Sequence, residues 1–143
     1  MNNLYLIVRI AGQTVAIGAS QVGSVIEVKA ITPVPRVAPH VAGLFALRSN
    51  VLTVIDGQAA LGRAPMAKDD ESHAVIVSVD GHSYALLVEE VVDVVLAGPP
   101  VTAAAVVGAD WGRVAIGQIA SEGATVLLID AALLIAGPEA LAA

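Results

Sequence analysis

The stretch that decides the fold is Gly12-Gln-Thr-Val-Ala-Ile-Gly-Ala-Ser-Gln-Val22, because its pattern returns later as Gly81-His-Ser-Tyr-Ala-Leu-Leu-Val-Glu-Glu-Val91. The two stretches are offset by 69 positions (81 minus 12), and they share a glycine, an alanine and a valine at matching places. Self-similarity at a fixed offset is the sign of a repeated structural unit. The pattern predicts a protein built from two copies of one small unit.

A second pair of stretches extends this repeat. Gly43-Leu-Phe-Ala-Leu-Arg-Ser-Asn-Val-Leu-Thr-Val-Ile-Asp56 aligns with Gly117-Gln-Ile-Ala-Ser-Glu-Gly-Ala-Thr-Val-Leu-Leu-Ile-Asp130, at an offset of 74 (117 minus 43). The longer offset places about five extra residues in the Pro-rich middle loop of the second copy, 97–107. We therefore expect repeat units at 10–63 and 73–136, joined by a polar linker at 64–72, within a single domain spanning 3–136.

Both copies have the alternating apolar pattern of short strands. The strands are expected at 4–10, 14–17, 24–31, 42–48 and 51–55, and then at 73–80, 83–88, 93–97, 113–120 and 125–129. Five strands per copy is the number in a small SH3-like barrel, and a barrel of ~55 residues is marginal alone. The predicted fold is all-β, with two tandem SH3-like five-stranded barrels packed together and a few short helices.

Turns and helices complete this pattern. Asn tolerates a positive φ, so we expect a hairpin turn around Ser49-Asn50. Single helical turns are expected at 19–23 and 89–92, and short helices at 57–61 and 131–135. Asp56 and Asp130 directly precede those two helices, and an aspartate in that position caps a helix N-terminus.

Composition excludes several classes of protein. Hydrophobic residues make up 57% of the chain, yet no run approaches the roughly 20 apolar residues of a membrane-spanning helix. The N-terminus has no basic region typical of a signal peptide, so we expect a cytoplasmic protein without direct membrane insertion. With no cysteine, there is neither a disulfide nor a catalytic thiolate.

Charge argues against nucleic-acid binding. The net charge is −6, and no basic run or aromatic cluster is present. Residues 1–63 carry five basic and two acidic side chains, whereas 64–143 carry two basic and eleven acidic ones. Two faces for different partners and a simple need for solubility explain this asymmetry equally well.

No arrangement of residues suggests catalysis, a metal or a cofactor. His40, His73 and His82 lack the mutual spacing of metal ligands. The serines include no nucleophile elbow, and no glycine-rich loop has the frame of a phosphate site. We expect a non-enzymatic protein without metal or cofactor.

The repeat, the Ile-Asp strand ends and the motif Gly43-Leu-Phe-Ala46-Leu47-Arg48-Ser49 together resemble the CheW family of chemotaxis coupling proteins. The resemblance extends from Leu4 to about Ile135 and includes the run Leu86-Leu-Val-Glu-Glu-Val-Val-Asp93-Val. It implies a scaffold that couples the regulatory domain of a chemotaxis histidine kinase to the cytoplasmic tip helices of chemoreceptors. An apolar groove between the barrels would receive the receptor's helical hairpin.

The resemblance also implies binding residues. The receptor-facing residues would be Ala46, Leu47, Arg48 and Ser49, and the kinase-facing residues would be Val22, Ser24 and Val25. Four positions depart from the family pattern, in which Asn, Gly, Pro and Leu are usual; they are Ala46, Ser49, Thr53 and Gly57. These departures put the identity of the partner in question more than the fold.

Each singled-out residue has a simpler interpretation beside the functional one. Arg48 aligns with Glu122, so its charge is not required by the fold, although an exposed loop arginine is also common. Asp56 and Asp130 recur, which favours capping over catalysis. Trp111 either fills the gap between the barrels or anchors a partner, and Glu89-Glu90 with Asp93 forms a solvated turn or an acidic binding edge.

The leading hypothesis is a chemosensory coupling adaptor with no chemistry of its own. One alternative is a divergent adaptor of the same family that serves a non-chemotactic kinase or regulator. Another, from a different class, is a carrier that holds a small ligand in a cavity between the barrels.

Overall fold

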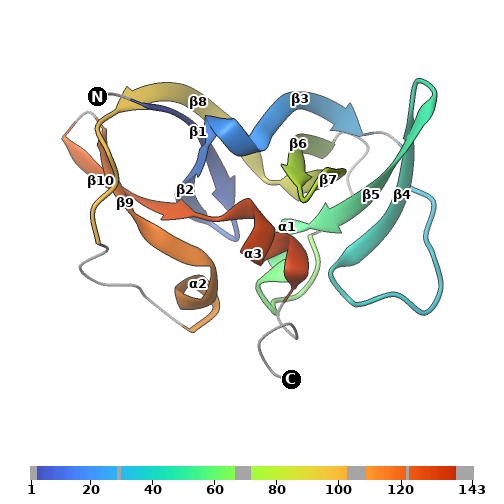
Figure 1. Ribbon diagram of the computed structural model, residues 1–143. Helices are drawn as coiled ribbons and strands as arrows, with labels where there is room; N and C mark the ends of the chain where they lie inside the picture. Colours follow the sequence, from blue (N-terminus) through green and yellow to red (C-terminus); the bar gives the residue numbers. More distant parts are fainter. Residues whose placement is uncertain (1–2, 29, 67–71, 103–108, 122, 138–143) are drawn as a thin grey trace.

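The computed structural model describes residues 3–28, 30–66, 72–102, 109–121 and 123–137, which form two five-stranded sheets and a few short helices (Figure 1). The first sheet, in spatial order, consists of β8 (Glu90–Ala97), β1 (Asn3–Ile10), β2 (Gln13–Gly18), β10 (Ala124–Ile129) and β9 (Ala115–Ser121). The second consists of β3 (Val22–Val28), β6 (Ser72–Val79), β7 (His82–Val88), β5 (Asn50–Asp56) and β4 (Val41–Leu47). The helices are η1 (Ala19–Gln21), α1 (Gly57–Ala60), α2 (Ala109–Val114) and α3 (Ala131–Ala136).

Each sheet closes on itself through one short backbone pairing. Thr32, beyond the end of β3, exchanges two backbone hydrogen bonds of 2.9 Å with Leu44 of β4. Val101, beyond the end of β8, pairs in the same way with Gln118 of β9, at 3.0 and 2.8 Å. Closure removes exposed sheet edges, and the predicted fold of two SH3-like barrels is confirmed. We call the sheet that contains β1 barrel A and the one that contains β3 barrel B.

Neither copy of the repeat forms a barrel by itself. Barrel A combines β1 and β2 of the first copy with β8, β9 and β10 of the second, and barrel B takes the five strands between them. Replacing each strand by its counterpart in the other copy converts the strand order of barrel A into that of barrel B. The two copies therefore exchange strands around an approximate twofold relationship.

The register of the strands follows the two sequence offsets. In the parallel pair β2–β10, Val15 lies opposite Leu127, and in the parallel pair β5–β7, Tyr84 lies opposite Thr53. Tyr84 is 69 positions after Val15, and Leu127 is 74 positions after Thr53. The repeat read from the sequence is thus present in the three-dimensional pairing.

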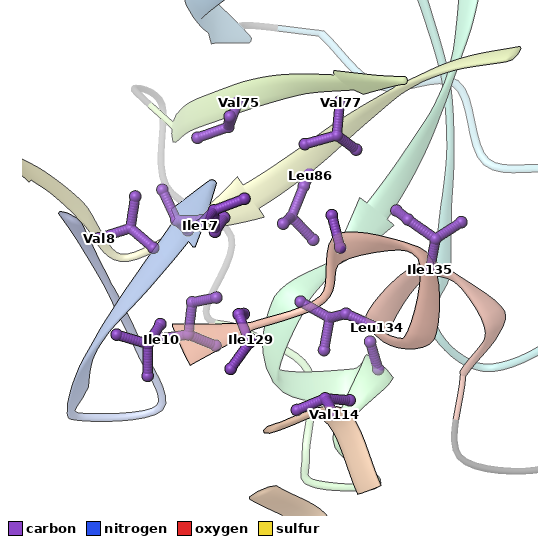
Figure 2. Packing of buried hydrophobic residues seen from close by; sticks show 14 of the residues in the cluster. Val8, Ile10, Ile17, Val75, Val77, Leu86, Val114, Ile129, Leu134 and Ile135 are labelled. Carbon is purple, nitrogen blue, oxygen red and sulfur yellow. The ribbon is translucent and has the colours of Figure 1, made fainter. Parts of the chain in front are cut away.

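The main core lies between the barrels rather than inside either one. Figure 2 shows Val8, Ile10, Ile17 and Ile129 of barrel A facing Val75, Val77 and Leu86 of barrel B, with Leu134 and Ile135 of α3 beside them. The helices α1 and α3 lie side by side in this region (Figure 1). Burial of these branched side chains joins the barrels into one unit.

Three local predictions were wrong. The hairpin turn consists of Arg48 and Ser49 rather than Ser49 and Asn50, and Arg48 carries the positive φ of 57°. The expected helical turn at 89–92 is absent, because Glu90 already pairs with Arg9 in the β1–β8 ladder. The strand expected from Arg113 starts at Ala115, because Arg113 and Val114 belong to α2.

Both predicted helix caps are confirmed. The Asp56 carboxylate accepts hydrogen bonds from the backbone N–H groups of Gln58 at 2.9 Å and Ala59 at 3.1 Å. The Asp130 carboxylate accepts one from Ala132 at 2.9 Å. These bonds satisfy N–H groups that a helix N-terminus leaves without partners.

Candidate functional site

The predicted receptor-facing residues lie at the tip of the β4–β5 hairpin. Arg48 and Ser49 form the turn, in which Ser49 is exposed, and Ala46 is exposed on the strand that leads into it. Leu47 instead packs against the interior of barrel B. In Figure 1 this hairpin lies on the side of barrel B away from barrel A. Glu122, the counterpart of Arg48 in the repeat, lies outside the described residues.

The predicted kinase-facing residues lie on β3, at the other edge of the second sheet. Val22 packs against the core between the barrels, whereas Ser24 and Val25 are exposed. Because the barrel closes between Thr32, beyond β3, and Leu44 of β4, these two strands are neighbours around it. The two predicted sets nevertheless lie on different strands, one on β3 and the other at the tip of the β4–β5 hairpin.

Two of the family departures have a structural setting. Gly57 is buried, and a Cβ there would lie 2.6 Å from the Leu87 carbonyl oxygen, so the close approach of β7 favours glycine. Thr53 is half-buried and lines a polar cavity together with Asn50 and Tyr84. The change at Gly57 is thus a matter of packing.

Trp111 is 4% exposed and belongs to the core between the barrels, which confirms the interpretation that it fills this gap. His40 is also buried, and its Nε2 lies 2.8 Å from the Ile135 carbonyl oxygen. His73 and His82 are exposed, as expected. Among the described residues, no group of three His, Asp or Glu side chains could hold a metal ion.

The feature that the sequence analysis missed is an exposed apolar surface on barrel A. Leu96 of β8 is 64% exposed, and it lies directly opposite Leu4 of β1, which is 50% exposed. Val94, one pleat away on β8, faces the same side because alternate strand residues share a face. Together with Val101 and Ile116 we call these residues, Leu4, Val94, Leu96, Val101 and Ile116, the apolar surface.

A groove indents barrel A beside Leu4. Its volume is about 560 Å³, and its apolar walls include Leu4, Pro100, Ile116 and Leu128. Ser20 and Gln21 of η1 supply polar groups along one side. The apolar surface and this groove are continuous at Leu4 and Ile116.

The pair on barrel B that corresponds to Leu4 and Leu96 is polar. The register pairs Glu27 of β3 with His73 of β6, just as it pairs Leu96 with Leu4. Both members of the barrel B pair are charged or titratable, and neither is buried. The fold therefore does not require apolar residues at these positions. Exposed apolar patches mark interaction sites, which suggests that the apolar surface binds a partner.

The sequence did contain a signal for this surface. The run from Val91 to Ala97 is apolar on both faces of a strand except at Asp93, as in a strand covered on both sides. On the outer face of β8, however, Val94 and Leu96 remain exposed in the described part of the chain.

Two polar contacts lie at the other end of the β1–β8 ladder from Leu4 and Leu96. Arg9 and Glu90 form an ion pair of 3.2 Å between exposed side chains. The carboxylate of Glu89 accepts a hydrogen bond from the backbone N–H of Gly12. These contacts hold the start of β8 against the end of β1 and against the β1–β2 turn. No helix in the described ranges is long and apolar enough to cross a membrane.

Comparison with known proteins adds two findings. The model of the CheW-like domain family matches residues 4–139. The fold is similar to that of the scaffolding protein TtCheW from Thermoanaerobacter tengcongensis, with a TM-score of 0.74, 20% identity, and coverage of 90% of this chain and 89% of that one. No curated protein matches the chain.

Proposed function

The chain belongs to the CheW-like domain family, and from this membership we propose that it is an adaptor coupling chemoreceptors to a chemotaxis histidine kinase in the cytoplasm. The family is one of non-catalytic scaffolds, which fits the expectation that the protein is not an enzyme. The observation that supports binding most directly is the exposed apolar surface on barrel A, whose Leu4–Leu96 pair corresponds to the polar pair His73–Glu27 on barrel B.

The apolar surface is suited to the apolar face of a helix. A helix presents apolar side chains at i, i+3, i+4 and i+7, and these fit a shallow apolar groove of the kind beside Leu4. We therefore assign the tip helices of a chemoreceptor to the apolar surface of barrel A, and the hairpin residues Ala46–Ser49 remain a second, separate receptor contact. The second partner, the regulatory domain of the kinase, would contact Val22, Ser24 and Val25.

The separation of these surfaces supports an adaptor. The apolar surface lies on barrel A, whereas the proposed kinase-facing residues of β3 lie on barrel B. Partners at separate surfaces do not compete, so one molecule can hold both at once. A protein that bound the receptor and the kinase only one at a time would not couple them.

A direct test is reconstitution with a soluble receptor-tip fragment and the kinase regulatory domain, monitored by size-exclusion chromatography with light scattering. We expect a ternary complex, and Leu96→Glu should lose the receptor fragment while retaining the kinase domain. Val37→Glu is the matched control, because Val37 is also exposed but lies outside the proposed surfaces. Retention of the receptor by Leu96→Glu would refute the assignment of the apolar surface.

The departures at Ala46, Ser49 and Thr53 favour one alternative, an adaptor of the same family for a non-chemotactic kinase. Affinity purification of the native complex separates the two, because the co-purified kinase is then identified directly. A carrier of a small ligand between the barrels is disfavoured, because apolar side chains fill that space (Figure 2).

A further inference from the structure

The side chain of Arg113 connects the ends of two helices where the barrels meet. Its Nη1 donates a hydrogen bond of 2.8 Å to the carbonyl oxygen of Leu133 in α3, and its Nη2 donates one to the carbonyl oxygen of Ala60 in α1. The last carbonyl groups of a helix have no partner within the helix. A cationic donor at that end also interacts favourably with their partial negative charge. Arg113 therefore serves both helix ends at once.

The two helices belong to different barrels. The helix α1 begins at Gly57, directly after β5 of barrel B ends at Asp56. The helix α3 begins at Ala131, two positions after β10 of barrel A ends at Ile129. Each helix thus continues a strand of its own barrel, and the two helices lie side by side (Figure 1). The spacing of the two carbonyl groups that Arg113 binds therefore depends on how the barrels are oriented.

Arg113 projects from an anchored base. Its neighbours on α2, Trp111 and Val114, are buried in the core between the barrels. Figure 2 shows Val114 among the side chains of this core, together with Leu134 of α3. Arg113 itself is half-buried, and a hydrogen bond is stronger where water is partly excluded. The arginine therefore meets the two helix ends from a fixed position.

The fold does not require this bridge. The carbonyl oxygens of His40 and Val114 accept equivalent backbone bonds of 2.9 Å from the two capping aspartates, which are 74 positions apart (130 minus 56). His40 and Val114 are thus counterparts in the repeat, and the counterpart of Arg113 is Pro39. Proline has no side-chain donor, and Pro39 is exposed. The first copy therefore forms its closed barrel without an arginine at this position.

An arginine bridge supplies a directional contact that the apolar core lacks. Burial of apolar surface is non-directional, and cores of suitable volume form before a single precise arrangement is fixed. The planar guanidinium, in contrast, holds its N–H groups in fixed directions. It can reach both carbonyl oxygens over a narrow range of helix positions. The bridge thus restricts the angle between the barrels more sharply than packing does.

We propose that Arg113 is a positioning residue that fixes the angle between barrel A and barrel B. It acts through the ends of α1 and α3, each of which follows the orientation of its barrel. In an adaptor whose partners lie on separate barrels, this angle sets the geometry between the partners. Only this consequence rests on the proposed function, because the angle is a property of the chain alone.

The test measures the distance between the barrels in the full chain without any partner. The chain has no cysteine, so nitroxide labels attach only at introduced ones, Ser83→Cys on β7 of barrel B and Thr125→Cys on β10 of barrel A. Both positions are exposed. Double electron–electron resonance should give a single narrow distance when Arg113 is present. Arg113→Met keeps an apolar stem but loses both bonds, so a broad or displaced distribution should replace the narrow peak.

Arg113→Lys is the finer variant. Lysine keeps the charge but has no planar pair of donors, so it should not restore the narrow peak. If Arg113→Met does not fold, Arg113→Lys decides by the same measurement. A narrow, unshifted peak in Arg113→Lys would overturn the inference, because charge without the bridge would then be sufficient.

Control variants separate positioning from stability. Arg9→Met also removes an arginine, but one whose ion pair lies within barrel A, and Gly43→Ala destabilises the closure of barrel B. Both should keep the narrow peak. Labels at Ser24→Cys and Ser83→Cys, both in barrel B, should stay narrow in Arg113→Met. An unchanged distance between barrels in Arg113→Met, or equal broadening in Gly43→Ala, would contradict the proposal. Failure of the ternary complex would refute the proposed function and leave this result intact.

Discussion

The imidazole of His40 holds the C-terminal end of α3, its Nε2 lying 2.8 Å from the carbonyl oxygen of Ile135. His40 belongs to the first copy and Ile135 to the second, so this bond joins the two copies. The ring also packs closely against Gly137, where an added Cβ would overlap the imidazole. A buried histidine that sequence reasoning left without a role is therefore part of the helix terminus.

His40→Ala should destabilise the protein by about 2–4 kcal/mol, because a buried bond is lost and a cavity replaces the ring. The free energy of unfolding in urea measures the effect. His73→Ala serves as the control, since His73 is exposed on β6 and should change stability by less than about 0.5 kcal/mol. Similar values for the two variants would contradict the proposed role of His40.

Gly43 is required where barrel B closes. Its φ is 149°, and a Cβ there would overlap the Thr32 carbonyl oxygen, which accepts the closing bond from Leu44. Gly43→Ala should therefore cost roughly 2–4 kcal/mol through strain and overpacking. Gly98→Ala should be nearly neutral, because no atom lies within 4 Å of its Cβ position. Thermal unfolding of both variants tests the contrast.

The two helix caps should differ in strength. The Asp56 carboxylate is buried and accepts a third bond, from Met66 N–H at 2.9 Å, besides its two capping bonds. Asp130 is less buried and shares its Oδ1 with the side chain of Gln21. Asp130→Ala should cost about 1 kcal/mol and Asp56→Ala about 2 kcal/mol or more.

Urea unfolding of these variants gives the values, and Asp56→Asn adds a finer test. Asparagine keeps one acceptor oxygen for the cap but loses the acceptor for Met66. The stability of Asp56→Asn should therefore fall between that of the unsubstituted protein and that of Asp56→Ala. A loss equal to that of Asp56→Ala would show that the cap bonds contribute little.

The sequence was sufficient for the strands but not for how they combine. The offsets of 69 and 74 reproduce the register of Val15 with Leu127 and of Tyr84 with Thr53. The same local pattern would arise whether each copy closed on itself or exchanged strands, because the exchanged partners are equivalent strands. The length and path of the connections between strands decide whether the copies close on themselves or exchange strands. The alternation of apolar and polar residues carries no information about those connections.

The candidate site was less predictable for a related reason. An apolar residue such as Leu96 looks alike in sequence whether its face of the strand is covered or exposed. Periodicity predicts that alternate residues share a face, but it does not say which neighbours cover that face. The turn at Arg48 was missed because Asn50 has the stronger preference for positive φ, yet pairing of Leu47 with Asn50 fixes the register.

If the copies exchange strands, fragments of the chain should behave differently than if each copy folded independently. All five strands of barrel B, β3 to β7, are contiguous in the chain between Val22 and Val88. The fragment 3–66 contains β1 to β5, but β3 lacks its partner β6 and β5 lacks β7. The hairpins β1–β2 and β4–β5 and the short Thr32–Leu44 pairing remain in it, and isolated hairpins are marginal in water.

We therefore expect the fragment 22–88 to keep sheet structure by circular dichroism and dispersed amide NMR signals, whereas 3–66 should lack both. Mixing 3–66 with 72–137 should restore the spectrum of the intact chain, because every strand then finds its partner. Stability of 22–88 will be low, since its face toward barrel A becomes exposed. A fragment 3–66 that unfolds cooperatively alone, with 22–88 unstructured, would show that each copy closes on itself.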